Sequence, residues 1–168
     1  MKRILYYSLL AFQAAVILLI TVQHALIDVY GTEIKLLEED SIQTDNYYQP
    51  NYQYLEYEIN RIDDEIWDIE DELNWKEKVY VVLKRDESEI FNAVRVTLEK
   101  PEAAPNEVIL LGRYKYTNEA ERKHYVDYDI ERMDNDKLQD QLSDKDQSII
   151  TVMVAPWGQK TVVAIDNK

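Results

Sequence analysis

An apolar segment near the start of the chain, residues 4–27, constrains the architecture more than any other feature. It reads ILYYSLLAFQAAVILLITVQHALI, and only Lys2 and Arg3 carry a charged side chain before it. An α-helix rises about 1.5 Å per residue, so this segment spans roughly 36 Å, against about 30 Å for a bilayer hydrocarbon core. A helix also satisfies its own backbone hydrogen bonds in lipid. The segment therefore predicts one transmembrane helix that contacts the lipid bilayer.

The charges on either side of this segment predict its orientation. Lys2 and Arg3 precede it, and the first charge after it is Asp28. Because positive residues stay on the cytoplasmic side, we expect a single-pass protein of the cell membrane with a cytoplasmic N-terminus and an extracytoplasmic C-terminal domain. A cleaved signal peptide is the alternative. Signal peptides have an apolar region of about 7–15 residues, and the best cut here, after Ala25, places Gln23 where a small residue is preferred.

Composition excludes several functions for the part of the chain that follows the apolar segment. The chain has 19 Lys and Arg against 33 Asp and Glu, a net charge of −14, and no cysteine. This balance argues against nucleic acid and against docking onto anionic lipid head groups, because both need clustered positive charge. An exported domain without cysteine has no disulfides and no thiolate metal site, and such export is most natural in a bacterium. We divide the chain into a cytoplasmic tip with its anchor, residues 1–28, and one extracytoplasmic domain, residues 29–168.

The hydrophobic pattern of residues 29–168 is mostly that of β-strands. One stretch differs: in residues 60–75, Ile62, Ile66, Ile69 and Leu73 recur with helical spacing, which predicts one amphipathic helix with an acidic outer face. About eight short strands and one helix predict an α+β, mostly-β domain, either a β-sandwich or an open barrel. The strands are expected at residues 33–37, 52–59, 79–83, 89–99, 107–117, 124–130, 149–155 and 160–166.

Several local features follow from the same pattern. Residues 38–49 are polar and predicted to form a loop, and Val94 is predicted to face inward from its strand. Gly112 lies inside a long strand, where glycine often marks a bulge. The sequence Ala155-Pro156-Trp157-Gly158 lies between the last two predicted strands. It predicts a hairpin turn, because proline suits the first central position of a turn and glycine suits the left-handed position.

Residues 50–57, Pro-Asn-Tyr-Gln-Tyr-Leu-Glu-Tyr, resemble the octapeptide that names the GDYXXLXY family of bacterial membrane-anchored proteins. Tyr52, Leu55 and Tyr57 match, whereas Pro50 and Asn51 stand where the family pattern has glycine and aspartate. The segment Tyr128-Asp-Ile-Glu131 is similar to the family's Tyr-Gly-Ile-Glu, with aspartate in place of glycine. The glycine-led segment from Gly31 and the closing hairpin at residues 152–166 are also similar.

The resemblance implies location more than activity. Proteins of this kind are associated with multi-pass membrane domains, which implies that another membrane protein is a possible partner. No established activity comes with the resemblance. The change from Gly-Asp to Pro-Asn also separates this chain from any role that depends on an acid at that place. From the residues alone, Leu55 and Tyr57 share one face of a strand and are predicted to lie in the core.

A search for catalytic and metal-binding motifs returns little, so we predict no enzyme, no cofactor and no metal. None of the serines lies in a Gly-x-Ser-x-Gly elbow, and His124 is interpreted as a solvated strand residue. Residues 134–136 and 144–146 offer carboxylates for calcium, but neither group has the glycine and the distal glutamate of an EF-hand loop.

Tyrosine is the one enriched residue that suits binding. The chain has 13 tyrosines, and Tyr47, Tyr48, Tyr52 and Tyr54 crowd one segment, where they are candidate binding residues because tyrosine offers rigid contact area at interfaces. The structural alternative is that they serve as strand residues. We therefore expect a membrane-tethered, non-enzymatic extracytoplasmic domain that acts through protein contacts at the cell envelope. The alternative is a module that binds a small ligand, a cation or a cell-wall polymer.

Overall fold

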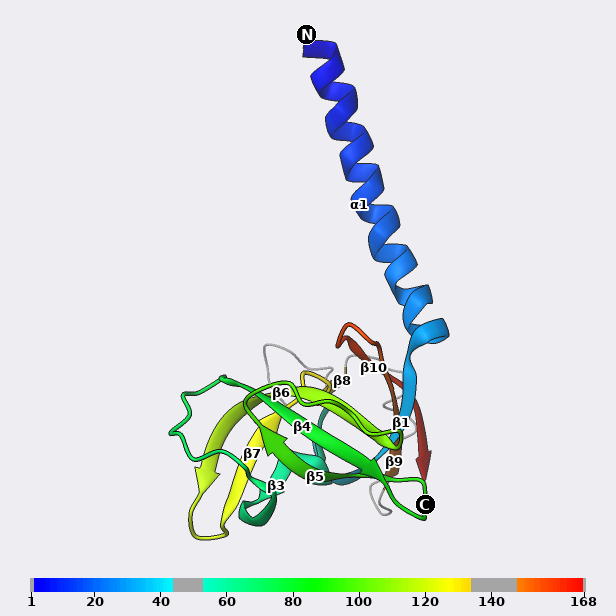
Figure 1. Ribbon diagram of the computed structural model, residues 1–168. Helices are drawn as coiled ribbons and strands as arrows, with labels where there is room; N and C mark the ends of the chain where they lie inside the picture. The colour runs from blue at the N-terminus through cyan, green and yellow to red at the C-terminus, as the bar shows by residue number, and fades with distance from the viewer. Residues whose placement is uncertain (1, 44–52, 134–147, 168) are drawn as a thin grey trace.

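The computed structural model consists of one long helix followed by two β-sheets (Figure 1). It describes residues 2–43, 53–133 and 148–167. In this part of the chain, one five-stranded sheet has the order β10-β9-β1-β2-β8 and the other has the order β3-β7-β6-β4-β5. The helix is α1 (Lys2–Tyr30); the strands are β1 (Thr32–Gln43), β2 (Gln53–Tyr57), β3 (Arg61–Asp63), β4 (Lys78–Arg85), β5 (Phe91–Thr97), β6 (Glu107–Asn118), β7 (Lys123–Asp127), β8 (Arg132–Met133), β9 (Ser148–Val154) and β10 (Lys160–Asn167); and two 3₁₀ turns are η1 (Glu58–Asn60) and η2 (Asp64–Ile66).

One hydrophobic core lies between the two sheets, so the mostly-β prediction is confirmed. Alternate residues point into it, as the two-residue period of a strand requires. From the first sheet, Ile34 and Leu36 are fully buried, and from the second, Val79, Val81 and Leu83 are fully buried. A parallel bridge between Lys35 and Ile90 joins the sheets at one edge.

Residues 60–75 do not form the predicted amphipathic helix. Instead, Arg61–Asp63 form the short strand β3, which pairs with β7 through Arg61↔Tyr125, Ile62↔His124 and Asp63↔Lys123. The predicted apolar residues still pack against the core, but from extended and 3₁₀ backbone. The many carboxylates of this stretch would repel one another at helical spacing, whereas strand pairing with β7 places Asp63 beside Lys123. Helical periodicity was therefore a misleading signal here.

Two further details differ from the predictions. Residues 38–43, expected in a loop, continue strand β1, because they pair with β2 from Glu38↔Tyr57 to Gln43↔Gln53. Val94 is exposed rather than inward, because the register shifts between Val82 and Leu83 and leaves Val94 as an extra residue opposite them.

Strand β6 has its bulge in a different place from the one predicted. Gly112 pairs regularly with Val79, and the register shift lies between Tyr114 and Tyr116, which makes Lys115 the extra residue. Gly112 is needed for another reason: a Cβ atom there would lie 2.3 Å from Cγ1 of Val126. The predicted hairpin is confirmed, with β9 and β10 paired and Gly158 at φ +92°.

Helix α1 extends away from the β-domain and meets it only at its last turns (Figure 1). Ile27 is buried there, and its carbonyl accepts a hydrogen bond from the Gly31 N–H at 2.8 Å. The large apolar side chains described before that point face solvent; Phe12 and Leu19, for example, are each 67% exposed. Over the described residues, no helical stretch combines the length and the hydropathy that crossing a bilayer requires.

Candidate functional site

The strand that carries the octapeptide, β2, has two different faces. Leu55 and Tyr57 point inward and are fully buried, which confirms their predicted place in the core. Tyr54 and Glu56 point to the opposite side, as the alternation of a strand dictates, and are partly exposed. The inner face therefore belongs to the structure of the domain, and the outer face is available to build a site.

Two buried tyrosine hydroxyls tie the octapeptide to the later segment Tyr128–Glu131. The Tyr57 hydroxyl donates a hydrogen bond to the carbonyl of Ile130 at 3.0 Å. The Tyr128 hydroxyl donates in the other direction, to the carbonyl of Ile59 at 2.7 Å. A buried hydroxyl needs such a partner to offset its loss of hydration. The two segments that carry the family resemblance thus hold each other in place across the core.

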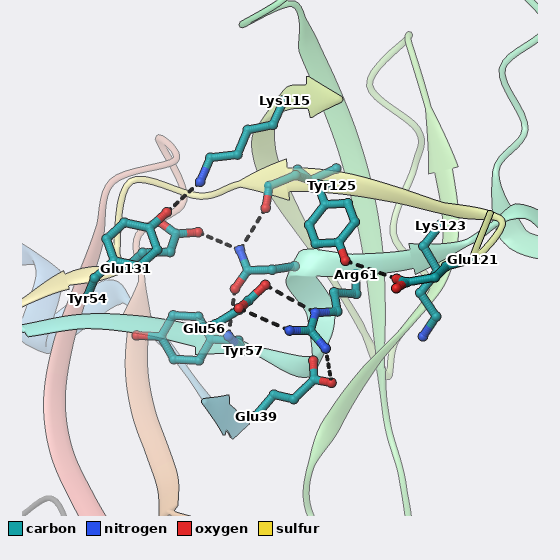
Figure 2. A network of polar contacts seen from close by, with 12 residues as sticks. Glu39, Tyr54, Glu56, Tyr57, Arg61, Lys115, Glu121, Lys123, Tyr125 and Glu131 are labelled. Carbon is teal, nitrogen blue, oxygen red and sulfur yellow. Dashed lines mark hydrogen bonds and ion pairs between the residues drawn. The ribbon is translucent and has the colours of Figure 1, made fainter. Parts of the chain in front are cut away.

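Glu131 lies at the centre of this contact, with only 2% of its surface exposed. Its Oε1 accepts hydrogen bonds from Asn60 Nδ2 at 2.7 Å and from the Tyr128 N–H at 2.6 Å, and its Oε2 accepts one from the Ile130 N–H at 2.9 Å. Asn60 also accepts a hydrogen bond from the Tyr57 N–H at 2.6 Å and donates one to the Val126 carbonyl at 2.7 Å. Figure 2 shows the Glu131 carboxyl in this network. The network joins η1, β7 and the loop before β8.

The surroundings of Glu131 favour its neutral form. Burial and the negative charge of nearby Asp127 together raise the pKa of the Glu131 carboxyl to about 7, against the opposing effect of the hydrogen bonds that it accepts from Tyr128 and Asn60. The pKa of Asp127 lies below its ordinary value, because the Asp129 N–H, Glu131 and Lys115 together outweigh its burial. Of these two carboxyls, Glu131 is therefore the one that takes up a proton as the pH falls below about 7.

A chain of polar contacts leads from this pair to the surface. Lys115 Nζ lies 3.2 Å from Asp127 Oδ2. It also donates a hydrogen bond to the Tyr54 hydroxyl at 2.5 Å (Figure 2). The same ammonium lies 5.0 Å from the centre of the Tyr54 ring. Burial opposes the charge of Lys115, but its contacts with Tyr54 and Asp127 raise its pKa above the ordinary value. The bulge at Lys115 is what places this side chain beside β2.

Of the four candidate binding tyrosines, only Tyr54 falls within the described residues. Tyr47, Tyr48 and Tyr52 lie outside them. Tyr54 is partly exposed, and its hydroxyl accepts a hydrogen bond from Lys115.

The outer face next to Tyr54 gathers further aromatic and cationic side chains. The rings of Tyr116 and Tyr125 stack with centroids 4.4 Å apart, and the Arg61 guanidinium lies 6.0 Å from the Tyr125 ring. Arg61 is held by two carboxylates, since Nη1 lies 2.6 Å from Glu39 Oε1 and Nε lies 3.2 Å from Glu56 Oε1 (Figure 2). We refer to this outer face of β2, β3, β6 and β7 as the tyrosine surface; it consists of Tyr54, Arg61, Lys115, Tyr116 and Tyr125.

His124 is not the solvated residue that the sequence predicted. Its side chain is only 12% exposed and stacks on Trp67, with the ring centroids 4.0 Å apart. Its Nδ1 forms a hydrogen bond with Thr117 Oγ1 at 2.9 Å, and its Nε2 forms one with Asp64 Oδ1 at 3.2 Å. Hydrogen bonds from Arg122 and His124 lower the pKa of Asp64. This cluster ties η2 to the β6–β7 hairpin, and we assign it a structural role.

The acidic residues considered for calcium, residues 134–136 and 144–146, lie outside the described residues. In the part of the chain that the structure does describe, no group of histidine, aspartate or glutamate side chains is arranged to hold a metal ion.

Sequence reasoning missed the residues that organise the site. Asn60 was predicted to begin a helix, and Glu131 was noted only as part of a family segment. Neither pattern indicates that the two form a buried amide–carboxyl pair. One signal was present: Asp129 occupies the position of a family glycine and has φ +61°, so the backbone there turns sharply and brings the Tyr128 and Ile130 N–H groups onto one carboxyl.

Comparison with known proteins gives one match. A family model described as "GDYXXLXY protein" matches residues 13–165, a range that includes the octapeptide, the Tyr128–Glu131 segment and the closing hairpin. No curated protein and no solved structure matches the chain significantly. The match confirms the resemblance inferred from the short motifs.

Proposed function

The chain belongs to the GDYXXLXY family, and from this premise we propose that it is a membrane-tethered, non-enzymatic domain that acts through contacts with another protein of the cell envelope. Its N-terminus lies in the cytoplasm and its β-domain lies outside, attached to the lipid bilayer through residues 4–27.

The exposed apolar surface of α1 is the observation that carries the tether. The side chains from Tyr7 to Ile20 are all exposed and are not buried against the β-domain. Covering a large aliphatic or aromatic side chain is worth about 1.5–3 kcal/mol. A helix that leaves a long row of them uncovered therefore favours an apolar environment outside the domain. Lys2 and Arg3 before the segment favour a cytoplasmic N-terminus.

The tyrosine surface is the part of the domain that best suits a protein partner. Tyrosine and arginine are enriched where protein interfaces gain most of their binding energy. Tyr116 is exposed, its ring is held rigid by stacking on Tyr125, and Arg61 is oriented by Glu39 and Glu56. Side chains already fixed in position lose little conformational entropy when a partner binds.

Site-specific photocrosslinking in intact cells tests this proposal. A photoreactive amino acid is placed at Tyr116, with a matched variant at Lys84, an exposed residue of β4 away from the tyrosine surface. We expect the Tyr116 variant to form a discrete crosslinked product with a membrane protein and the Lys84 variant to form none. Equal products from both positions, or none from Tyr116, would refute the assignment of the tyrosine surface.

Binding of a small ligand is the second candidate, favoured by a cleft of about 550 Å³. It lies between β1 and the β4–β5 turn and is lined by Phe91 and by charged side chains that include Lys35, Arg85 and Glu89. Lys35 Nζ already pairs with Glu89 Oε2 at 3.0 Å, so a ligand would compete with an ion pair. A pull-down with cell-wall glycans that depends on Phe91 would support this candidate, and the same crosslinking experiment would then give no protein product.

A further inference from the structure

The turn between β9 and β10 lies beside the end of α1. Strands β1 and β9 pair from Thr32↔Val154, so the residues after Val154 extend past the start of β1 toward the helix. Met153 Cε is also close to Gly31, the residue that follows α1. Figure 1 shows the β9–β10 turn on the same side of the domain as the helix. If residues 4–27 lie in lipid, this turn lies at the level of the lipid head groups.

Two aromatic side chains are exposed at this level. Trp157, at the tip of the turn, is 46% exposed, and Tyr30, in the last turn of α1, is 62% exposed. Tryptophan and tyrosine are favoured at the boundary between hydrocarbon and water, because their rings are apolar and their polar groups reach water.

Next to the turn is a pocket of about 270 Å³ with three positive side chains, which we call the hairpin pocket. Lys78 from the start of β4, Arg113 from β6 and Lys160 from β10 line it, together with the single acid Asp129, which lies 3.3 Å from Arg113. Lys160 Nζ donates one of its three N–H groups to the Leu111 carbonyl at 2.6 Å, which fixes the ammonium in place. Burial lowers the pKa of Lys160, so a neighbouring anion would stabilise its charge.

This concentration of positive charge stands out in a chain of net charge −14. The overall charge predicts no attraction of the domain as a whole to an anionic bilayer, and the hairpin pocket is a local exception to that charge balance. Strand β3 and the acidic turn η2 that follows it lie on the side of the domain away from α1 (Figure 1). Three basic side chains therefore gather beside the β9–β10 turn, while the exposed acids Asp28 and Glu33 also lie near the end of α1.

We propose that the face formed by Tyr30, Trp157 and the hairpin pocket docks onto anionic phospholipids of the bilayer that holds α1, with a lipid phosphate between Lys78, Arg113 and Lys160. This inference rests on the proposed membrane tether. It adds a second contact with the membrane, one that sets the height and tilt of the β-domain and so directs the tyrosine surface along the membrane.

A depth measurement on the full chain in vesicles tests the docking. The chain has no cysteine, so single labels can be introduced as Pro156→Cys, in the β9–β10 turn, and as Ala120→Cys, in the distant β6–β7 turn. The fluorophore at each position is quenched by a lipid with a nitroxide on its head group. We expect the label at position 156 to be quenched about twofold more strongly in vesicles with about 30 mol% phosphatidylglycerol than in pure phosphatidylcholine, and the label at position 120 to show no difference.

Charge variants identify the hairpin pocket as the cause. Lys78→Glu is expected to abolish the dependence on phosphatidylglycerol, since each basic group near an anionic surface changes the docked fraction about fivefold. Lys84→Glu, on the same strand at its other end, is the matched control and should behave like the wild type. Arg113→Gln should weaken the dependence, and about 0.5 M salt should remove it by screening.

Each outcome separates the docking from the tether. Quenching at position 156 that is independent of phosphatidylglycerol and of Lys78→Glu, in a chain that still floats with the vesicles, would overturn the docking and leave the tether intact. The same result is expected if the natural occupant of the hairpin pocket is an acidic segment of a partner protein and not a lipid phosphate. A chain that does not float with the vesicles would contradict the tether itself.

Discussion

Replacing Glu131 by glutamine removes a buried group whose ionisation near neutral pH is expected to weaken the domain. In the folded state its pKa is raised from 4.5 to about 7. The folded protein therefore holds a proton that the unfolded chain has lost, and the free energy of unfolding falls as pH rises through this interval. Because one pKa unit corresponds to about 1.4 kcal/mol, the wild type is expected to lose about 2–3 kcal/mol between pH 5 and pH 8.

Other titrating groups do not disturb this comparison. The lowered pKa of Asp127 contributes stability that is lost only as pH falls below its ordinary value near 4, outside the interval. The pKa of Glu39, raised chiefly by burial, acts in the same direction as that of Glu131 but is present in both proteins, so it cancels in the difference. The glutamine carbonyl still accepts the hydrogen bonds from Asn60 and from the Tyr128 N–H. The glutamine NH2 group, however, faces the Ile130 N–H, so two donors oppose each other and the variant is expected to be less stable than the wild type at pH 5.

Urea denaturation of the full chain in detergent micelles at several pH values measures the effect. The fluorescence of Trp67, which stacks on His124 at the edge of the core, reports unfolding. Between pH 5 and pH 8, the stability difference between Glu131→Gln and wild type should shift by about 2–3 kcal/mol in favour of the variant. Parallel pH profiles, within about 0.5 kcal/mol, would refute the reasoning, because Glu131 would then not titrate in this range.

Further substitutions test the packing around the same site. Tyr57→Phe and Tyr128→Phe should each lower the free energy of unfolding by about 1–2 kcal/mol, measured by urea denaturation, because each leaves a buried carbonyl without its donor; no loss in either would contradict the reciprocal hydrogen bonds. Gly112→Ala should cost about 1–3 kcal/mol, since the new methyl group overlaps Val126, and the double variant with Val126→Ala should cost less than the sum of the two; strict additivity would count against the overlap. Asp129→Gly should be tolerated within about 1 kcal/mol in thermal unfolding, whereas Asp129→Val should be clearly destabilising, because φ there is +61°; equal effects would show that the left-handed backbone is not required.

Much of the β-architecture could be predicted from local patterns. Strand β4 and the β9–β10 hairpin were predicted correctly because a buried apolar run and a Pro-x-Gly turn each have few alternatives. The position of Tyr57 in the core followed from the two-residue period of β2. These are signals that a few neighbouring residues carry by themselves.

The errors came where a distant partner decides the local structure. Residues 60–75 have helical spacing, but strand β7 offers Arg61–Asp63 a pairing that a helix cannot make. The bulge at Lys115 and the extra residue at Val94 depend on the register of neighbouring strands, which no local pattern reveals. The buried network is of the same kind, since Asn60 and Glu131 meet only after two segments far apart in the chain have folded together.

The site and the tether suggest how the parts work together. The network around Glu131 fixes β2 against the loop before β8, and Lys115 extends that rigidity to Tyr54 on the tyrosine surface. A surface held in this way keeps one shape, and in the proposed arrangement α1 would hold the domain close to the membrane. Changes at Glu131 should therefore weaken partner crosslinking at Tyr116 without removing the protein from the membrane.

Membrane association of α1 is the most direct test of the central claim. The full chain is mixed with phosphatidylcholine vesicles, washed at alkaline pH and floated on a density gradient, next to a variant with Leu18→Asp and Leu19→Asp, each of which should oppose insertion by about 2.5–3.5 kcal/mol. We expect the wild type to float with the vesicles and the variant to remain in the soluble fraction. Recovery of the folded wild type in the soluble fraction, with its exposed apolar helix covered in some other way, would contradict the account.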